Sequence, residues 1–206
     1  MITAPLPIIL ASASPQRKTL LLQAGFHFEI CVPDEWAEDG RLDSEPPEEY
    51  ALRLAFQKAK NVADKIQDGI IIGCDTIVLC GEDILEKPVD RDDACRMIRR
   101  LLGQVHHVLS GLCVIKKESG NGGRESVIQE TATTQLFMQP ISDSEIDVYL
   151  DTGIWQGKSG AFAFQVCRDW PGCKGWLSIM EGSESNVVGL PMELLQTVLA
   201  RLASAR

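Results

Sequence analysis

Two serines and an arginine follow the first apolar segment of the chain at a spacing that suits anion binding. Residues 8–11 are typical of a short buried strand, and Ser12 and Ser14 precede Pro15, which suits the first position of a helix. A strand that runs into a hydroxyl-rich turn and a helix N-terminus presents N–H donors and partial positive charge to an anion such as phosphate. Arg17 would add a full charge. The alternative is that Ser14 merely caps the helix.

A carboxylate interrupts a second apolar segment at Asp75. Residues 70–79 are otherwise typical of a buried strand, and an ionised Asp is rarely buried without a partner. Asp75 is therefore expected to face a cleft, a metal or a cation, unless local N–H groups satisfy it at a bulge. A phosphatase of the haloacid dehalogenase class would need a second Asp two residues on, where this chain has Ile77.

Three lysines occupy positions from which they could hold phosphate oxygens. Lys58 lies on an expected helix, Lys87 follows a strand, and Lys158 lies between glycines. A single lysine is ordinarily solvated surface. Several that converge with Arg17 would form a polyphosphate clamp, because each supplies a point charge to phosphate oxygens.

Helices and strands mix along the chain that must position these side chains. Apolar periodicity and cap signals predict strands at residues 8–11, 28–32, 70–79, 105–116 and 125–138, and helices at 15–24, 47–65, 90–102, 142–153 and 191–203. A hairpin is expected around Gly81 and another at residues 118–123. The pattern predicts an α/β or α+β fold with a mixed sheet.

Composition excludes several classes of protein. A chain of 206 residues is expected to form one large domain or two tightly joined lobes, and its net charge of −9 argues against non-specific nucleic-acid binding. No apolar run approaches the roughly 20 residues that span a membrane, and the N-terminus lacks a secretory signal pattern. Seven scattered cysteines without a CxxC motif favour reduced, unbridged thiols in the cytoplasm.

The order of these segments resembles the Maf family of nucleoside triphosphate pyrophosphatases. The resemblance extends over nearly the whole chain. Seven motifs of that family are matched in order, at Ser12–Arg17, Glu38, Arg53–Ala59, Gly73–Thr76, Lys87–Asp90, Gly157–Gln165 and Asn186–Pro191. It implies a single domain over residues 1–206 with a Maf/ITPase-like fold, in which helices flank a long twisted mixed sheet and two lobes enclose a central cleft.

The resemblance also implies an activity, which is hydrolysis of a nucleoside triphosphate to the monophosphate and pyrophosphate. Asp75 would be the base for the attacking water, and Asp75 with Glu38 would hold a divalent cation, Mg²⁺ or Mn²⁺. The substrate-binding residues would be Ser12, Arg17, Lys58, Lys87 and Gln165. The family further suggests a homodimer, with no nucleic-acid or membrane partner.

Selectivity would depend on three positions. Thr76 and Gln165 match the pyrimidine-preferring branch of the family, which favours UTP, dTTP or modified pyrimidine nucleotides, whereas Gln16 replaces an arginine of the family pattern. Ile154 replaces a glutamate, Val166 replaces a glycine, and an extra segment at 167–175 would be a longer hairpin or a lid. Gln16 and Ile154 favour the alternative function, a nucleotide-binding regulator of cell division or septum formation with little turnover.

Overall fold

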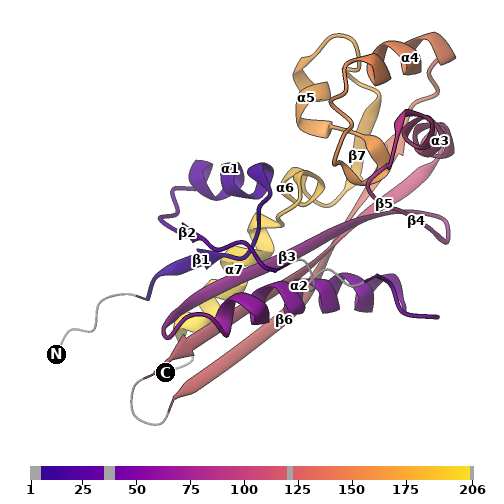
Figure 1. Cartoon of the computed structure of the whole chain (residues 1–206). Coiled ribbons are helices and arrows are strands. Elements are labelled where there is room, and N and C mark those ends of the chain that lie inside the picture. The colour runs from indigo at the N-terminus through magenta and orange to yellow at the C-terminus, as the bar shows by residue number, and fades with distance from the viewer. Residues whose placement is uncertain (1–5, 35–39, 120–122, 205–206) are drawn as a thin grey trace. The chain divides into compact units, whose positions relative to one another are not determined.

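The computed structural model describes residues 6–34, 40–119 and 123–204 (Figure 1). Fifteen helices and strands are formed within these ranges. In chain order they are β1 (Ile8–Leu10), α1 (Pro15–Gln23), β2 (Glu29–Ile30), α2 (Pro47–Ala63), β3 (Gly69–Cys80), β4 (Asp83–Leu85), α3 (Arg91–Leu101), β5 (Val105–Glu118), β6 (Arg124–Met138), α4 (Asp143–Asp151), the 3₁₀ turn η2 (Ser159–Ala161), α5 (Phe164–Asp169), β7 (Leu177–Glu181), α6 (Glu184–Val188) and α7 (Met192–Ser204).

The strands form a seven-stranded mixed sheet. Their order is β2-β1-β3-β5-β6-β7, with β4 also paired to β3. β1 runs parallel to both β2 and β3, whereas β4 pairs antiparallel with β3 and β7 pairs antiparallel with β6. The predicted mixed α/β fold and the hairpin around Gly81 are therefore confirmed. None of the helices in the described part of the chain is long and apolar enough to cross a membrane.

Contacts divide the chain into two compact units. The first comprises Met1–Asp75, Ser110–Ala132 and Gly189–Arg206, and the second comprises Thr76–Leu109 and Thr133–Val188. The boundary thus falls within β3, directly after Asp75. The expectations of a single domain and of a cleft between two lobes stay predictions.

Helices cover both faces of the sheet in the first unit (Figure 1). Because side chains alternate along a strand, Ile71 of β3 packs with Ala55 and Ala59 of α2, while its neighbour Ile72 packs with Leu21 of α1 and with side chains of α7. The alternation places α2 on one face and α1 and α7 on the other. α2 begins at Pro47 with two acidic residues in its first turn, as predicted.

Two glycines bring α2 unusually close to the sheet. A Cβ atom added at Gly73 of β3 would lie 2.3 Å from the Ala55 carbonyl oxygen, and one at Gly111 of β5 would lie 2.2 Å from the Ala51 carbonyl oxygen. Only glycine fits at either position, because these distances are far below van der Waals contact. Gly111 therefore permits the close approach of α2 to β5, and Gly73 permits its close approach to β3, so that Gly73 sets the separation between the two elements that carry Lys58 and Asp75.

The second unit has a core of its own, built around aromatic side chains. Tyr149, Trp155 and Trp176 are buried there with aliphatic residues of α3, β5 and β6. The predicted capping box of α4 is present, since Ser142 and Glu145 each cap the other's backbone N–H.

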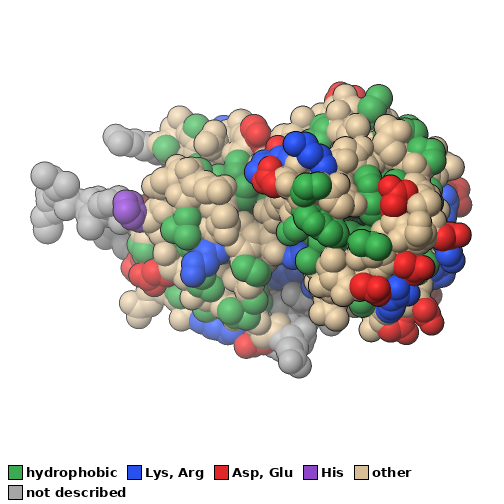
Figure 2. All heavy atoms as spheres, turned by 90° about the horizontal axis from the view of Figure 1, so that it is seen from above, with side chains coloured by type: hydrophobic (Ala, Val, Ile, Leu, Met, Phe, Trp, Pro, Cys, Tyr) green, Lys and Arg blue, Asp and Glu red, His purple; other side chains and the backbone are tan. Residues whose placement is uncertain are grey.

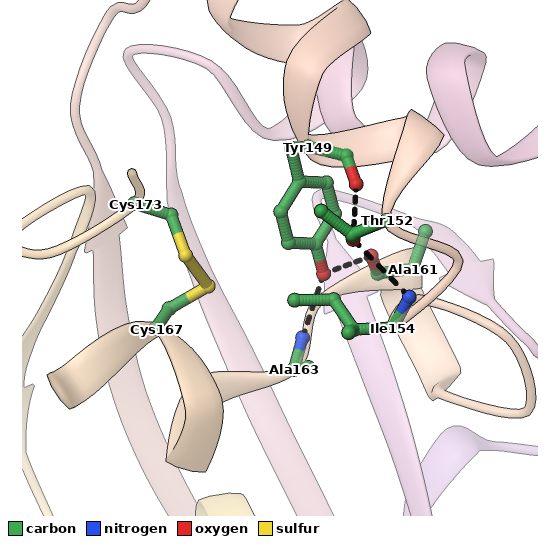
Figure 3. Close-up of a disulfide and its surroundings, with 7 residues drawn as sticks. All are labelled: Tyr149, Thr152, Ile154, Ala161, Ala163, Cys167 and Cys173. Carbon is green, nitrogen blue, oxygen red and sulfur yellow. Dashed lines mark hydrogen bonds between the residues drawn. A yellow bond between two sulfur atoms is a disulfide. The ribbon is translucent and has the colours of Figure 1, made fainter. Parts of the chain in front are cut away.

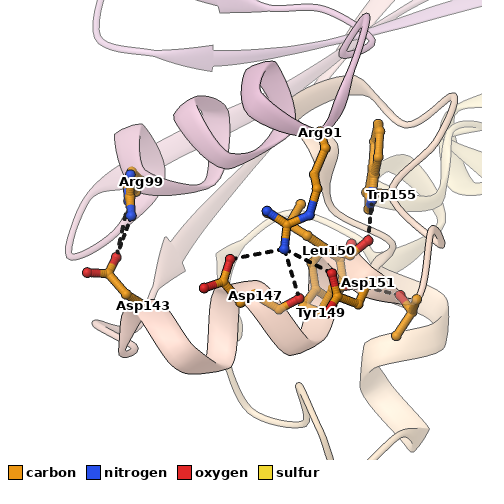
Figure 4. Close-up of polar contacts among 9 residues, drawn as sticks. Arg91, Arg99, Asp143, Asp147, Tyr149, Leu150, Asp151 and Trp155 are labelled. Carbon is orange, nitrogen blue, oxygen red and sulfur yellow. Dashed lines mark hydrogen bonds and ion pairs between the residues drawn. The ribbon is translucent and has the colours of Figure 1, made fainter.

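Ion pairs join α3 to α4 at the surface of this unit (Figure 4). Arg91 reaches Asp147 at 3.0 Å and Asp151 at 2.9 Å, and Arg99 reaches Asp143 at 2.7 Å. These side chains are exposed to solvent, which screens their charges, so the pairs contribute little to stability. On the face shown in Figure 2, acidic and basic side chains are interspersed, and the residues placed by the structure form no broad basic patch there.

The expectation that all cysteines are unbridged is wrong. Cys167 of α5 and Cys173 form a disulfide (Figure 3), while Cys31, Cys74, Cys80, Cys95 and Cys113 are free. After α5 the chain turns back, with the Cys173 N–H donating to the Trp170 carbonyl at 3.2 Å, and this return brings the two Cα atoms to 4.9 Å. Residues 167–175 are thus the end of a helix and a series of turns, and the expectation of a longer hairpin is also wrong.

Candidate functional site

The turn between β1 and α1 holds Arg17 in a fixed position. Its Nη1 donates to the Ser12 hydroxyl at 3.3 Å, and its Nε donates to the Gly189 carbonyl at 2.8 Å. Ser12 is buried, and its hydroxyl also accepts from the Ser14 N–H at 3.1 Å. Ser12 and Arg17, both predicted as substrate-binding residues, therefore lie in direct contact.

Ser14 caps α1, as the alternative interpretation of this turn expected. Its hydroxyl accepts from the Arg17 N–H at 3.5 Å and donates to the Gln16 side-chain oxygen at 3.1 Å. Gln16, at a position predicted to affect selectivity, thus contacts the cap of the helix. The cap and an anion site are compatible, because a helix N-terminus has four N–H groups without intrahelical partners.

Lys58 and Asp75 form the central contact of the first unit. The Lys58 ammonium lies 2.6 Å from Asp75 Oδ1, and the two side chains are 6% and 14% exposed. Asp75, which was expected to face a cleft, a metal or a cation, therefore contacts a cation. The pair forms because Gly73 lets α2 lie against β3, with Asp75 on the same face of the strand two residues further on.

The Gly189 carbonyl connects the Arg17 turn with β3. It accepts from Arg17 Nε at 2.8 Å and from the Cys74 thiol at 3.4 Å. The Arg17 guanidinium consequently lies beside the residue that precedes Asp75. Gly189 was not predicted as part of the site, although the match at Asn186–Pro191 was a signal that could have identified it.

The remaining predicted residues belong to the second unit. The Thr76 carbonyl accepts from the Ser159 hydroxyl at 3.3 Å, and the Glu86 carbonyl, one residue before Lys87, accepts from the Gly160 N–H at 3.1 Å. Lys87 is exposed, and Gln165 is half-buried on α5. The loop at residues 157–163 is thus hydrogen-bonded to the segments that carry Thr76 and Lys87. The same loop leads directly into α5, which carries Gln165.

Two further expectations bear on carboxylates. Glu38, expected to bind a metal with Asp75, lies outside the described residues. Elsewhere in the chain, over the ranges that the structure describes, no group of three or more His, Cys, Asp or Glu side chains is placed to hold a metal ion. Ile154, at the position of the family's glutamate, packs against the apolar core of the second unit.

The first unit therefore combines two cationic side chains and a carboxylate. Arg17 supplies planar N–H donors, Lys58 supplies an ammonium, and Asp75 is an acceptor in contact with that ammonium. Cations of this kind can neutralise phosphate oxygens, and a fixed carboxylate can accept a proton from water. The geometry suits hydrolysis of a phosphate ester or anhydride.

Comparisons with known proteins agree with this chemistry. A protein named dTTP/UTP pyrophosphatase from Geotalea uraniireducens is 40% identical over 204 residues, which are 99% of each chain. Another of the same name, from Rhodopirellula baltica, is 38% identical over 95% of this chain and 82% of its own. The solved structure of a nucleoside-triphosphatase / dITP/XTP pyrophosphatase from Mycobacterium abscessus covers 64% of this chain and 74% of its own, at 14% identity and a TM-score of 0.37, which is too distant to support a conclusion.

The family itself follows from the extent of the match. The family model described as Maf-like protein matches residues 7–202, a range that contains every predicted site residue. With relatives that match over 82% and 99% of their own length at 38–40% identity, the assignment does not depend on any single motif. The chain belongs to the Maf family.

Proposed function

We propose that this protein hydrolyses dTTP and UTP to the nucleoside monophosphate and pyrophosphate. The observation that carries the proposal is the Lys58–Asp75 pair at 2.6 Å, because it fixes a carboxylate beside a cation within a largely buried strand. The substrate is inferred from the relatives named dTTP/UTP pyrophosphatase, which match this chain over most of its length.

Asp75 is the proposed base. It would accept a proton from water as the water oxygen forms a bond to the α-phosphorus, and the bond from that phosphorus to the bridging oxygen would break to release pyrophosphate. The Lys58 ammonium holds the carboxylate in place. A base positioned in this way typically accelerates a reaction about 10²–10⁴-fold.

Arg17, Lys58 and Lys87 are the proposed phosphate-binding residues, with Ser12 as a neutral donor. Arg17 is well suited because Ser12 and Gly189 fix the orientation of its planar guanidinium, a group with five N–H donors that matches phosphate oxygens. Preorganised donors of this kind stabilise the charge that develops on phosphate oxygens during transfer.

A divalent cation is part of this proposal. The described donor set fits Mg²⁺ or Mn²⁺ bound together with substrate, because Mg²⁺ is ordinarily held by one or two carboxylates and by phosphate oxygens, and keeps several waters. Asp75 and Glu38 would hold the ion, which would supply neutralisation of phosphate charge when bound.

Thr76, Gln165 and Gln16 are the proposed selectivity residues. The Gln165 amide can both donate to and accept from a base edge, which suits recognition of a pyrimidine. Gln16 has an amide where the family pattern has an arginine, so the preference over purine nucleotides should be smaller than in relatives that keep the arginine. A homodimer also stays a prediction, which sedimentation would test.

The test is a pyrophosphate-release assay on UTP, dTTP, ATP and GTP with Mg²⁺ or Mn²⁺. We expect faster cleavage of the pyrimidine nucleotides, and we expect Asp75→Asn to reduce turnover by about 10²–10⁴ while nucleotide binding persists. Asp64→Asn is the matched control, since Asp64 pairs with Lys60 at the surface of the same unit. Nucleotide binding without pyrophosphate release by the unmodified protein would instead favour a regulator, and near-normal turnover of Asp75→Asn would refute the role of Asp75.

A further inference from the structure

The loop at residues 157–163 in the second unit is held more firmly than its glycine content suggests. Besides the bonds to the Thr76 and Glu86 carbonyls, the Lys158 N–H donates to the Trp155 carbonyl at 3.1 Å. The Lys158 carbonyl accepts from the Ala161 N–H at 3.0 Å. The backbone of Lys158 is thus fixed on both sides.

A buried tyrosine holds the far end of this loop (Figure 3). The Tyr149 hydroxyl donates to the Ala161 carbonyl at 3.0 Å and accepts from the Ala163 N–H at 2.9 Å. Between these bonds, Ala161 has a φ of 58°, a conformation that a residue with a Cβ rarely adopts. Backbone strain of this kind persists where surrounding contacts impose it, and it is concentrated at functional sites.

The side chain that this loop presents is a cation, and among the residues that the structure describes it has no carboxylate partner. Lys158 is half-buried. Burial lowers its pKa, because desolvation disfavours the charged form. A phosphate oxygen at this ammonium would reverse that effect, since a nearby negative charge favours the protonated lysine.

We propose that Lys158 is a further substrate-binding residue, whose ammonium contacts a phosphate oxygen of the nucleoside triphosphate. The inference rests on the proposed function for the identity of the ligand. It is supported by the bond from Gly160 to Glu86, which ties this loop to the residue before Lys87, itself a proposed phosphate-binding residue. An ammonium is a point charge with three donors and suits a phosphate better than a base edge, which the amide of Gln165 can recognise.

The test measures binding apart from turnover, with α,β-imido-UTP as the probe and calorimetry as the readout. Lys158→Met, which keeps the apolar stem, should weaken binding about tenfold to a hundredfold, and Lys158→Arg should restore most of it. Lys174→Met is the matched control, because Lys174 is an exposed lysine of the same unit. Equal affinities of the Lys158→Met and Lys174→Met variants would overturn the proposal.

Binding of uridine, which has the base and the sugar but no phosphate, tests whether Lys158 contacts the phosphate or the nucleoside. The affinity for uridine should not change in Lys158→Met, and a loss equal to that of the triphosphate analogue would overturn the phosphate contact. Tyr149→Phe should also weaken binding of the analogue, but much less in the Lys158→Met background, because the tyrosine acts through the loop. Failure of the unmodified protein to release pyrophosphate would refute the proposed function, while loss of analogue binding in Lys158→Met would still support the contact.

Discussion

Substituting Gly73 by alanine should disturb stability and turnover together. The added Cβ would lie 2.3 Å from the Ala55 carbonyl oxygen and 2.8 Å from both the Cβ and the nitrogen of Ala59. Two of these three atoms are backbone, so no side chain can rotate away to make room. Because non-bonded contact requires about 3.5 Å, α2 would have to move from β3 by about 1 Å.

Two effects of different size follow from that displacement. Overpacking of a well-filled interior costs typically about 1–3 kcal/mol of unfolding free energy. The displacement also separates Lys58 on α2 from Asp75 on β3, which now lie 2.6 Å apart. A misplacement of about 1 Å can reduce catalysis by about 10²-fold, so the loss of turnover should exceed what partial unfolding explains.

The assay compares three glycine variants by urea unfolding and by pyrophosphate release. Gly111→Ala creates an equally close contact, 2.2 Å from the Ala51 carbonyl, but this carbonyl lies about two turns before Lys58, so stability should fall with a smaller loss of turnover. Gly40→Ala is the control, since a Cβ there meets nothing within 4 Å. Wild-type turnover in a destabilised Gly73→Ala variant would refute the dependence of catalysis on this spacing.

Three further outcomes are expected. Replacing Cys167 and Cys173 by serine should lower the unfolding free energy by about 2 kcal/mol, given their sequence separation of 6; equal thermal stability with and without dithiothreitol would contradict this. Burial lowers the pKa of His106 to about 4, so the unfolded chain binds a proton that the folded chain does not between about pH 6.5 and 4. Stability in urea should therefore fall as pH falls through that window, by at most about 3 kcal/mol, and His106→Leu should flatten the profile. Gln165→Glu should reduce the preference for UTP over ATP about tenfold, because the carboxylate has no donor; an unchanged ratio of kcat/KM values would exclude a base contact.

The elements that could be predicted from sequence are those whose ends are marked by local chemistry. α3 begins after Asp90, whose side chain caps it, and the two arginines at 99 and 100 lie in its last turn. The capping box at Ser142 marks α4 in the same way, and the apolar run at 70–79 marks β3. Each signal lies within a few residues, so it can be recognised without knowledge of the rest of the chain.

The region from η2 to α6 could not be predicted in this way. α5 and α6 have only 6 and 5 residues, which are too few to form an isolated helix, and they exist because of contacts made elsewhere. The bond from Asn186 to the Val108 carbonyl at 3.1 Å joins α6 to a strand 78 residues away. The disulfide was missed because the spacing of the cysteines gives no pairing signal, although Pro171 and Gly172 do mark a turn between them.

Sequence reasoning on the site had the same limit. The apolar surroundings of Asp75 indicate that it needs a partner, but they leave open whether it faces a cleft, a metal or a cation, or is satisfied by local N–H groups at a bulge. The partner is Lys58, 17 residues earlier, and the contact depends on the close approach that Gly73 permits. Motif order identified both residues, whereas only the packing of α2 on β3 explains why they meet.

Ile154 and Gln16 are the two departures from the family pattern that favour a regulator, and their surroundings show how the fold accommodates each of them. Ile154 packs with the apolar core of the second unit, so the loss of the family's carboxylate there is accompanied by apolar burial. Gln16 accepts a hydrogen bond from Ser14 at the cap of α1, and Arg17 beside it keeps its contacts with Ser12 and Gly189. Each substitution is thus accommodated within its own unit, and the Lys58–Asp75 pair on which the proposed hydrolysis depends is formed.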